Sequence, residues 1–204
     1  MKAQPLRERR ALVDGFVVCE KMRAAHLRAL LHTEPMPLPY PLIASDLDGT
    51  LLNAEHRIDD YTRDTLLALE ARGVQFVLAT GRHYLNVAGI RDQLGIRAHL
   101  ITANGARIHG PDNQLLHAQN LPAEAARALA QPEFADGSTL SVYLDDAWLM
   151  DQPSAELDAM LKDSDFSYTL ADLAAHSGQG VAKMLYFGEH AHLLALQAKL
   201  LRHF

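Results

Sequence analysis

The stretch Leu42-Ile43-Ala44-Ser45-Asp46-Leu47-Asp48-Gly49-Thr50 decides the fold. Its first four residues form a short apolar run that is typical of a buried strand. Asp46 and Asp48 follow at the carboxyl end of that strand, where open α/β sheets build their sites. If the extended backbone persists, the two carboxylates face the same side while Leu47 points into the fold. Gly49 allows a sharp turn and a close approach of substrate.

Strand and helix signals alternate after this stretch. Asp59 or Asp60 can cap a helix that Gly73 stops, and Gly95 can end a second helix. The expected elements are a helix to residue 72, a strand over 74–79, a helix over 84–94 and a strand over 100–103. The β-α-β-α-β order predicts parallel strands joined by right-handed crossovers, which is an α/β fold.

The pattern changes in the second half of the chain. Turn-rich loops at 110–113 and 145–146 indicate two hairpins, and an amphipathic pattern over 189–204 indicates a closing helix. Helices over 122–131 and 154–162 and a strand over 181–187 complete an α+β layout. We therefore expect a first domain over 36–118 and a second over 119–204.

Residues 1–35 differ from the rest of the chain. Residues 20–32 could form an amphipathic helix, and the proline-rich stretch 35–41 prevents it from continuing. We interpret 1–35 as an N-terminal extension, with Met36 as an alternative start, because regular organisation is expected only after Met36. The alternative is a docking or regulatory arm.

Composition excludes several classes of protein. The formal net charge of -6 argues against a general nucleic-acid binder, which needs clustered Lys and Arg. No apolar run approaches the roughly 20 residues that a membrane-spanning helix requires. The single cysteine, Cys19, excludes an intrachain disulfide and fits a reducing compartment. We expect a cytoplasmic protein with no nucleic-acid or membrane partner.

Polar residues at three consecutive strand ends indicate phosphate chemistry. The carboxylates of Asp46 and Asp48 suit covalent phosphoryl transfer, in which one attacks phosphorus and the other handles protons. Both are anionic at neutral pH, so a cation is needed, and hard oxygen ligands favour Mg²⁺. Thr80-Gly81-Arg82 ends the second strand and opens a helix whose N–H groups favour an anion. Asn104-Gly105 ends the third strand at the same edge of the sheet.

The chain resembles the haloacid dehalogenase superfamily of phosphatases, and within it the Cof-type sugar-phosphatase-like branch. The resemblance is carried by three motifs in order, at 43–52, 78–82 and 102–106. It implies an incomplete Rossmann-like parallel-sheet core with an α+β cap domain. It also implies small phosphorylated metabolites as substrates, either sugar phosphates or phosphorylated cofactors such as pyridoxal phosphate.

The same resemblance assigns roles to single residues. Asp46 would be the nucleophile that forms an aspartyl-phosphate and binds Mg²⁺ with its carboxylate. Asp48 would be the general acid/base and would bind the metal through its backbone carbonyl. Thr80 would hydrogen-bond the transferring phosphoryl group. The substrate side would be lined by Gly81, Arg82, Asn104 and Gly105.

Two further motifs of the superfamily, a lysine and a Gly-Asp-Gly-x-x-Asp-like run, are not found in this sequence. Lys183 superficially matches the lysine motif, but we interpret it as a residue of a cap strand. Without the missing part of the core, strand 42–45 is expected to be an unpaired edge. The metal is also expected to lose acidic ligands. We therefore expect that the chain stops within the cap and that, as written, it is a poor or inactive catalyst.

Three other functions compete with phosphatase activity. A non-catalytic phosphate-binding or regulatory module stays open as the alternative. A phosphoacceptor receiver domain is disfavoured because it gives the turn after Asp48 and the large cap no role. A DxD-type glycosyltransferase is weaker, since no nucleotide-sugar site is evident.

Overall fold

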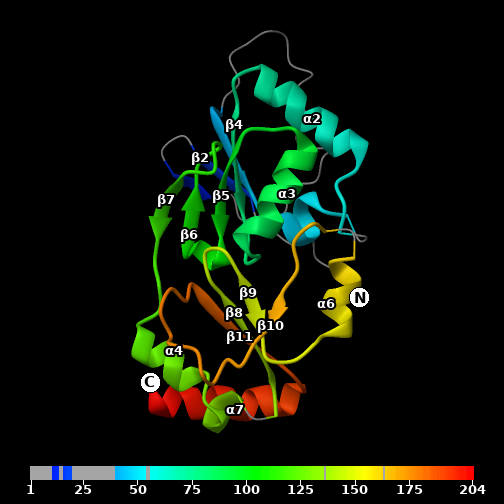
Figure 1. The fold of residues 1–204 in the computed structure, drawn as a ribbon. Coiled ribbons are helices and arrows are strands. Elements are labelled where there is room, and N and C mark those ends of the chain that lie inside the picture. The colour runs from blue at the N-terminus through cyan, green and yellow to red at the C-terminus, as the bar shows by residue number, and fades with distance from the viewer. Residues whose placement is uncertain (1–10, 14–15, 20–39, 54–55, 136, 163) are drawn as a thin grey trace, which may run out of the picture.

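The computed structural model describes residues 11–13, 16–19, 40–53, 56–135, 137–162 and 164–204, the first two ranges by their backbone alone. The helix expected over 20–32 lies outside these residues. Strands of the described chain form two sheets, one at each end of the molecule in Figure 1. The first has the order β1-β2-β3-β4-β5-β6-β7, and the second has the order β10-β9-β8-β11.

The first sheet is parallel at its centre. Strands β2, β3, β4 and β5 pair in parallel, and β1, β6 and β7 join antiparallel at the two sides. This confirms the expected α/β fold with a parallel core. The strand bounds are β1 Ala11–Val13, β2 Phe16–Cys19, β3 Leu42–Ser45, β4 Gln75–Ala79, β5 Ala98–Thr102, β6 Arg107–His109 and β7 Leu115–Ala118.

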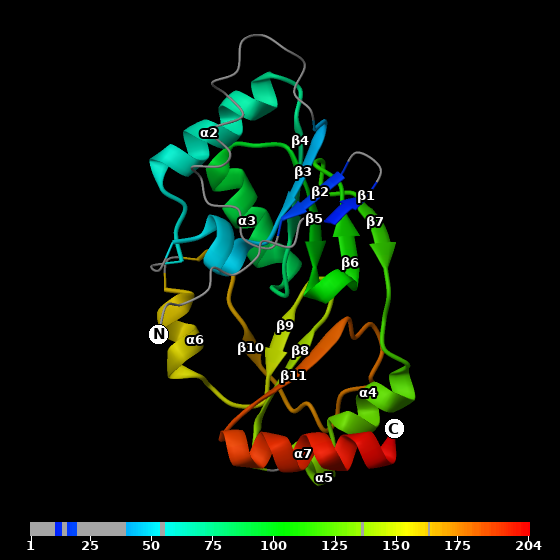
Figure 2. The same cartoon turned by 180° about the vertical axis from the view of Figure 1, so that it is seen from behind.

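Two helices connect the parallel strands and lie on the same side of the sheet (Figures 1 and 2). Helix α2 spans Asp60–Ala71, and Asp59 caps it by accepting a hydrogen bond from the Thr62 N–H at 2.6 Å. Helix α3 spans Tyr84–Leu94 and ends at Gly95, whose φ of 71° is the left-handed conformation of a C-terminal cap. Leu66 and Leu69 of α2, with Val87 and Leu94 of α3, are buried against the parallel strands in one apolar core, whereas Leu67 is exposed.

The expectation of an unpaired β3 edge was wrong, as was the view that regular structure begins only after Met36. Residues Val17, Val18 and Cys19 of β2 pair with Ile43, Ala44 and Ser45 of β3. The run 16–19 is apolar and rich in valine, which favours a strand beside a buried one. A segment before Met36 therefore covers the edge of β3 that the sequence leaves open.

The second sheet carries the remaining helices. Its strands are β8 Thr139–Tyr143, β9 Trp148–Met150, β10 Thr169–Leu170 and β11 Lys183–Phe187. The helices are α4 Ala123–Leu129, α5 Pro132–Ala135, α6 Ala155–Met160 and α7 His190–His203. Helix α7 lies at the end of the molecule that is remote from the first sheet (Figures 1 and 2). In the part of the chain that is described, no helix has the length and apolar character needed to cross a bilayer.

Candidate active site

Asp46 lies where β3 gives way to a tight helical turn, Leu47–Leu51. Its Oδ1 accepts a hydrogen bond from the Leu47 N–H at 2.8 Å, which holds the carboxylate above the end of the strand. Leu47 is fully buried in the core, as expected, and this burial fixes the position of the turn. Gly49 has a φ of 71°, a conformation that favours glycine. The chain therefore folds back just after the two aspartates.

Asp48 is held by a bidentate ion pair with Arg82. Arg82 Nη2 lies 2.6 Å from Asp48 Oδ1, and Arg82 Nε lies 2.9 Å from Oδ2. The hydrogen bonds and charge of Arg82 lower the pKa of Asp48, although partial burial opposes them. His56 lies 3.6 Å from the same Oδ1 and acts in the same direction. Asp48 is thus an anion in this arrangement.

The loops after β4 and β5 are joined by main-chain hydrogen bonds. The Asn104 N–H donates to the Thr80 carbonyl at 3.2 Å, and the Ala103 N–H donates to the Arg82 carbonyl at 3.0 Å. The Thr80 hydroxyl accepts a hydrogen bond from the Arg82 N–H. These contacts make one polar surface, the strand-end platform, from residues 80–82 and 103–105.

The structure brings most of the predicted residues together. Thr80, Gly81, Arg82 and Asn104 belong to the strand-end platform, and Asp48 joins it through Arg82. The hydrogen bond described for the Asp46 carboxylate is local, to Leu47. Gly105 follows Asn104 in the same turn, with a φ of 98° that favours glycine.

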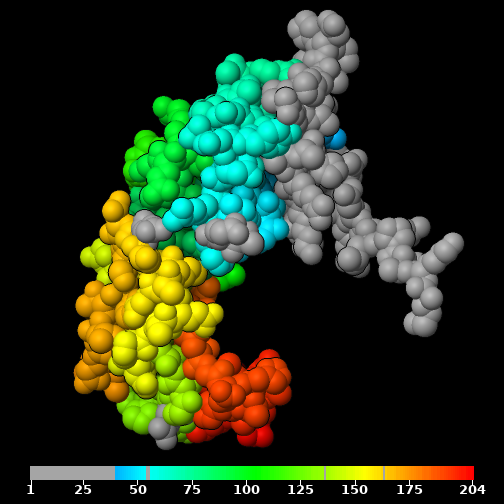
Figure 3. Space-filling model, turned by 90° about the vertical axis from the view of Figure 1, so that its right-hand side faces the viewer, coloured from blue at the N-terminus to red at the C-terminus, as the bar shows by residue number. Residues whose placement is uncertain are grey.

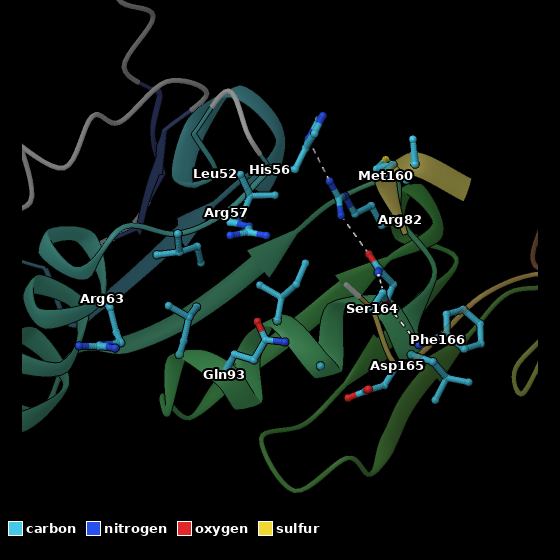
Figure 4. Close-up of a pocket in the computed structure, with 17 residues that line it drawn as sticks. Leu52, His56, Arg57, Arg63, Arg82, Gln93, Met160, Ser164, Asp165 and Phe166 are labelled. Carbon is cyan, nitrogen blue, oxygen red and sulfur yellow. Dashed lines mark hydrogen bonds between the residues drawn. The ribbon is translucent and has the colours of Figure 1, made fainter. Parts of the chain in front are cut away.

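A pocket of about 790 Å³ opens beside the Asp48–Arg82 pair. Figure 4 shows His56, Arg82 and Ser164 along one side of it, joined by hydrogen bonds that pass through Asn86. Arg57 and Gln93 lie to the left of these residues in Figure 4, and apolar side chains such as Leu52 also line the pocket. In Figure 3 the segment around α6 meets the segment after β3 on this face. The pocket thus lies where the two halves of the chain meet.

His83 is a packing histidine that ties α3 to the second sheet. Only 2% exposed, it stacks on Phe166, and its Nδ1 accepts a hydrogen bond from the Leu85 N–H. Nε2 therefore carries the proton and donates it to the Leu144 carbonyl at 2.8 Å. The neutral imidazole satisfies both partners, whereas a protonated ring would place two N–H groups face to face at Leu85.

This burial predicts a pH dependence of stability. Burial lowers the pKa of His83 below its ordinary 6.5, so the unfolded chain binds the proton more readily than the folded chain. The resulting stabilisation is complete above the unfolded pKa and is lost as the pH falls through the folded pKa. We expect His83→Gln to reduce the slope of unfolding free energy below pH 6.5 by up to about 1.4 kcal/mol per pH unit. Chemical denaturation at a series of pH values measures this slope.

His190→Gln is the matched control, because His190 is exposed at the start of α7. It should keep the wild-type slope. His109 remains in every variant, and burial also lowers its pKa. Part of the pH dependence of stability therefore persists in His83→Gln. If His83→Gln left the slope of unfolding free energy against pH unchanged, His83 would not be the buried neutral histidine described above.

Sequence reasoning missed four residues that the structure places around the platform. His56, Asn86 and Ser164 extend the Arg82 network, and Lys183 reaches the Gly81 carbonyl. Lys183 does begin strand β11, as interpreted from the sequence. Lys183 has one sequence signal of a functional role, because it interrupts an apolar run. His56, Asn86 and Ser164 have no such signal.

The donor set at the end of β3 fits a hard cation. The Asp46 carboxylate and the Asp48 backbone carbonyl are oxygen donors of the kind that Mg²⁺ takes. Among the described residues, three or more His, Cys, Asp or Glu side chains nowhere gather into a metal-binding group. Mg²⁺ commonly keeps several waters and uses one or two carboxylates plus substrate phosphates, and in such a site the Asp46 carboxylate and the Asp48 carbonyl would be the protein ligands.

The fold and the strand-end motifs define a class of protein. The sequence profile of the haloacid dehalogenase-like hydrolases matches residues 43–204. The chain belongs to this family, which confirms the resemblance seen in the three motifs. It is 37% identical over 168 residues to a protein from Serratia proteamaculans named HMP-PP phosphatase, covering 81% of this chain and 61% of the relative. The chain thus spans less than two thirds of that relative's length.

Solved structures share the fold. A haloacid dehalogenase-like hydrolase from Bacteroides thetaiotaomicron superposes with a TM-score of 0.67 at 24% identity, over 78% of this chain and 62% of that one. A sugar phosphatase of the superfamily's subclass IIB gives a TM-score of 0.64 at 24% identity, over 77% and 62%. At this identity the likeness establishes the architecture alone.

Proposed function

We propose that this chain is a Mg²⁺-dependent phosphatase that hydrolyses small phosphomonoesters through an aspartyl-phosphate on Asp46. The observation that carries the proposal is the convergence of polar groups at the ends of β3, β4 and β5. Asp46 follows β3, Thr80 follows β4 and Asn104 follows β5, and parallel pairing brings these strand ends to one edge of the sheet. Membership of a hydrolase family and relatives named as phosphatases support it.

The proposed reaction has two displacement steps. In the first, an Asp46 carboxylate oxygen bonds to phosphorus while the bond from phosphorus to the leaving oxygen breaks, and Asp48 protonates that oxygen. In the second, water attacks phosphorus, Asp48 accepts its proton, and the bond from phosphorus to Asp46 breaks. Bound Mg²⁺ would offset the negative charge of the carboxylate and the phosphoryl oxygens. Thr80 and the N-terminal end of α3 would orient the phosphoryl group.

Asp48 must change partner during this cycle. Arg82 keeps it ionised in the structure, which suits a base and opposes an acid. A substrate that draws Arg82 toward its own anionic group would release Asp48 to take and give a proton. Arg82 would therefore contribute on the substrate side of the site, as the family resemblance implies.

The substrate class follows from the pocket and the relatives. A volume of about 790 Å³ with mixed apolar and cationic walls suits a small phosphorylated metabolite such as a sugar phosphate or a phosphorylated cofactor. The subclass IIB sugar phosphatase and the HMP-PP phosphatases fit this class by name. A cytoplasmic location is proposed with it.

The second candidate is a non-catalytic phosphate-binding module. The observation in its favour is the Asp48–Arg82 ion pair, which occupies both oxygens of the proposed acid/base. Such a module would bind phosphate at the platform without turnover.

Hydrolysis of p-nitrophenyl phosphate by the purified chain separates the two candidates. We expect slow turnover that EDTA abolishes and added Mg²⁺ restores, because the lysine and Gly-Asp-Gly-x-x-Asp-like motifs of the family are not found in this sequence. Asp48→Asn should lower kcat by about 10²- to 10⁴-fold, because general acid/base catalysis contributes that much. Asp60→Asn, on the exposed first turn of α2, is the control and should keep the wild-type rate. Turnover that survives EDTA, or that survives Asp48→Asn, would contradict the phosphatase proposal.

A further inference from the structure

Lys183 crosses from the second sheet to the strand-end platform. It is the first residue of β11, and its Nζ donates a hydrogen bond to the Gly81 carbonyl at 2.8 Å. The same Nζ lies 5.4 Å from the centre of the Tyr143 ring, the residue opposite it in β8. Lys183 and Tyr143 are each more than sixty residues away from Gly81 in the sequence. Only folding of the chain therefore brings the Lys183 ammonium group to the platform.

The charge of Lys183 is not balanced by a carboxylate. Within the described part of the chain, no Asp or Glu oxygen lies within 4.0 Å of its Nζ. The side chain is half-buried, and desolvation lowers its pKa. An ammonium group has three N–H donors, and the Gly81 carbonyl engages one of them. A desolvated cation with spare donors is the binding partner that an anion requires.

Gly81 makes room for this arrangement. A Cβ on Gly81 would lie 3.2 Å from Lys183 Nζ and 3.1 Å from Asn104 Oδ1, so both side chains converge on the space that glycine leaves open. Asn104 ends the neighbouring strand and belongs to the platform. A cation, an amide and the Thr80 hydroxyl thus lie around one short loop.

We propose that Lys183 is a phosphate-binding residue, which the second sheet supplies to the platform formed by Thr80, Gly81 and Asn104. This rests on the proposed function, which places the phosphoryl group at the platform. Lys183 donates to a phosphoryl oxygen while β11 lies against the Gly81 loop. Binding of the phosphate therefore also holds the two halves of the chain together around the pocket.

Calorimetric titration of inorganic phosphate into the full chain, with Mg²⁺ present, tests the assignment. We expect Lys183→Met to weaken phosphate binding by about ten- to a hundredfold, the range of one charge-assisted hydrogen bond. Lys183→Arg keeps the charge and should recover most of the affinity. The matched control is Lys199→Met, because Lys199 contacts the Glu133 carbonyl and the Phe134 ring far from the platform. It should bind phosphate as the wild type does.

A lysine that only fastens β11 to the Gly81 loop gives a different result. Lys183→Met would then lower the free energy of unfolding and leave the dissociation constant for phosphate unchanged, which overturns the proposal. Absence of saturable phosphate binding to the wild type overturns it too. Adding Thr80→Val to Lys183→Met supplies a double-mutant cycle, in which non-additive losses place both residues on the same phosphate. Strictly additive losses would contradict a shared ligand.

The assignment and the proposed function fail in distinguishable ways. Lys183-dependent phosphate binding without hydrolysis of p-nitrophenyl phosphate keeps the lysine assignment and removes the phosphatase. Hydrolysis whose KM and kcat are the same in Lys183→Met and wild type keeps the phosphatase and removes the lysine assignment.

Discussion

Asp46→Asn should reduce turnover of a phosphomonoester by at least about 10⁴-fold, because an amide cannot replace the carboxylate that attacks phosphorus. The fold should survive. The side-chain oxygen of asparagine can still accept the hydrogen bond from the Leu47 N–H that orients Asp46. Steady-state hydrolysis of p-nitrophenyl phosphate measures the loss, and chemical denaturation checks that the free energy of unfolding is unchanged.

Asp92→Asn is a suitable control for this variant. Asp92 is an exposed aspartate on α3 that pairs with the neighbouring Arg91 and does not touch the platform. It should hydrolyse the substrate at the wild-type rate. Activity of Asp46→Asn within tenfold of wild type would contradict the nucleophile assignment.

Arg107→Met should have the largest effect on stability. Arg107 is 3% exposed on β6 and donates hydrogen bonds to the carbonyls of Ala106, Gln119 and Gly180. It also donates to the side chains of Asp145 and Asn120, so one guanidinium joins the first sheet to the second half of the chain. Its removal takes one donor from each of these acceptors, of which the Ala106 carbonyl keeps the Gln119 N–H. We expect a loss of about 3–4 kcal/mol in the free energy of unfolding.

Urea denaturation followed by circular dichroism measures this loss. Arg97→Met, at an exposed position just before β5, is the control and should change the free energy of unfolding by less than about 0.5 kcal/mol. If Arg107→Met also changed the free energy of unfolding by less than about 0.5 kcal/mol, water would satisfy the acceptors. Arg107 would then not join the first sheet to the second half of the chain.

The sequence predicted the strand-end residues because their signals are local. The apolar run before Asp46, the Asp59 cap and the Gly95 stop each act within one turn or strand, and the structure places them as expected. Parallel pairing then brings the ends of β3, β4 and β5 to one edge of the sheet. The roles of Asp46, Asp48, Thr80, Gly81, Arg82, Asn104 and Gly105 stay predictions.

What the sequence could not predict depends on contacts between distant segments. The pairing of β2 with β3 needs a partner strand before the proline-rich stretch, where charge and composition suggested only an extension. The reach of Lys183 to Gly81 depends on how the second sheet packs on the first. The Asp48–Arg82 pair likewise forms between residues 34 positions apart. The sequence pattern of a single helix or strand does not indicate which distant segment that element will contact.

Capture of the covalent intermediate tests directly whether Asp46 is the nucleophile. The chain is mixed with Mg²⁺ and a ³²P-labelled phosphomonoester, quenched in acid and digested, and the label is located by peptide mass spectrometry. We expect an acyl phosphate on Asp46 that hydroxylamine removes and that Asp46→Asn does not form. Turnover with no label on the protein, or with the label on another residue, would contradict it.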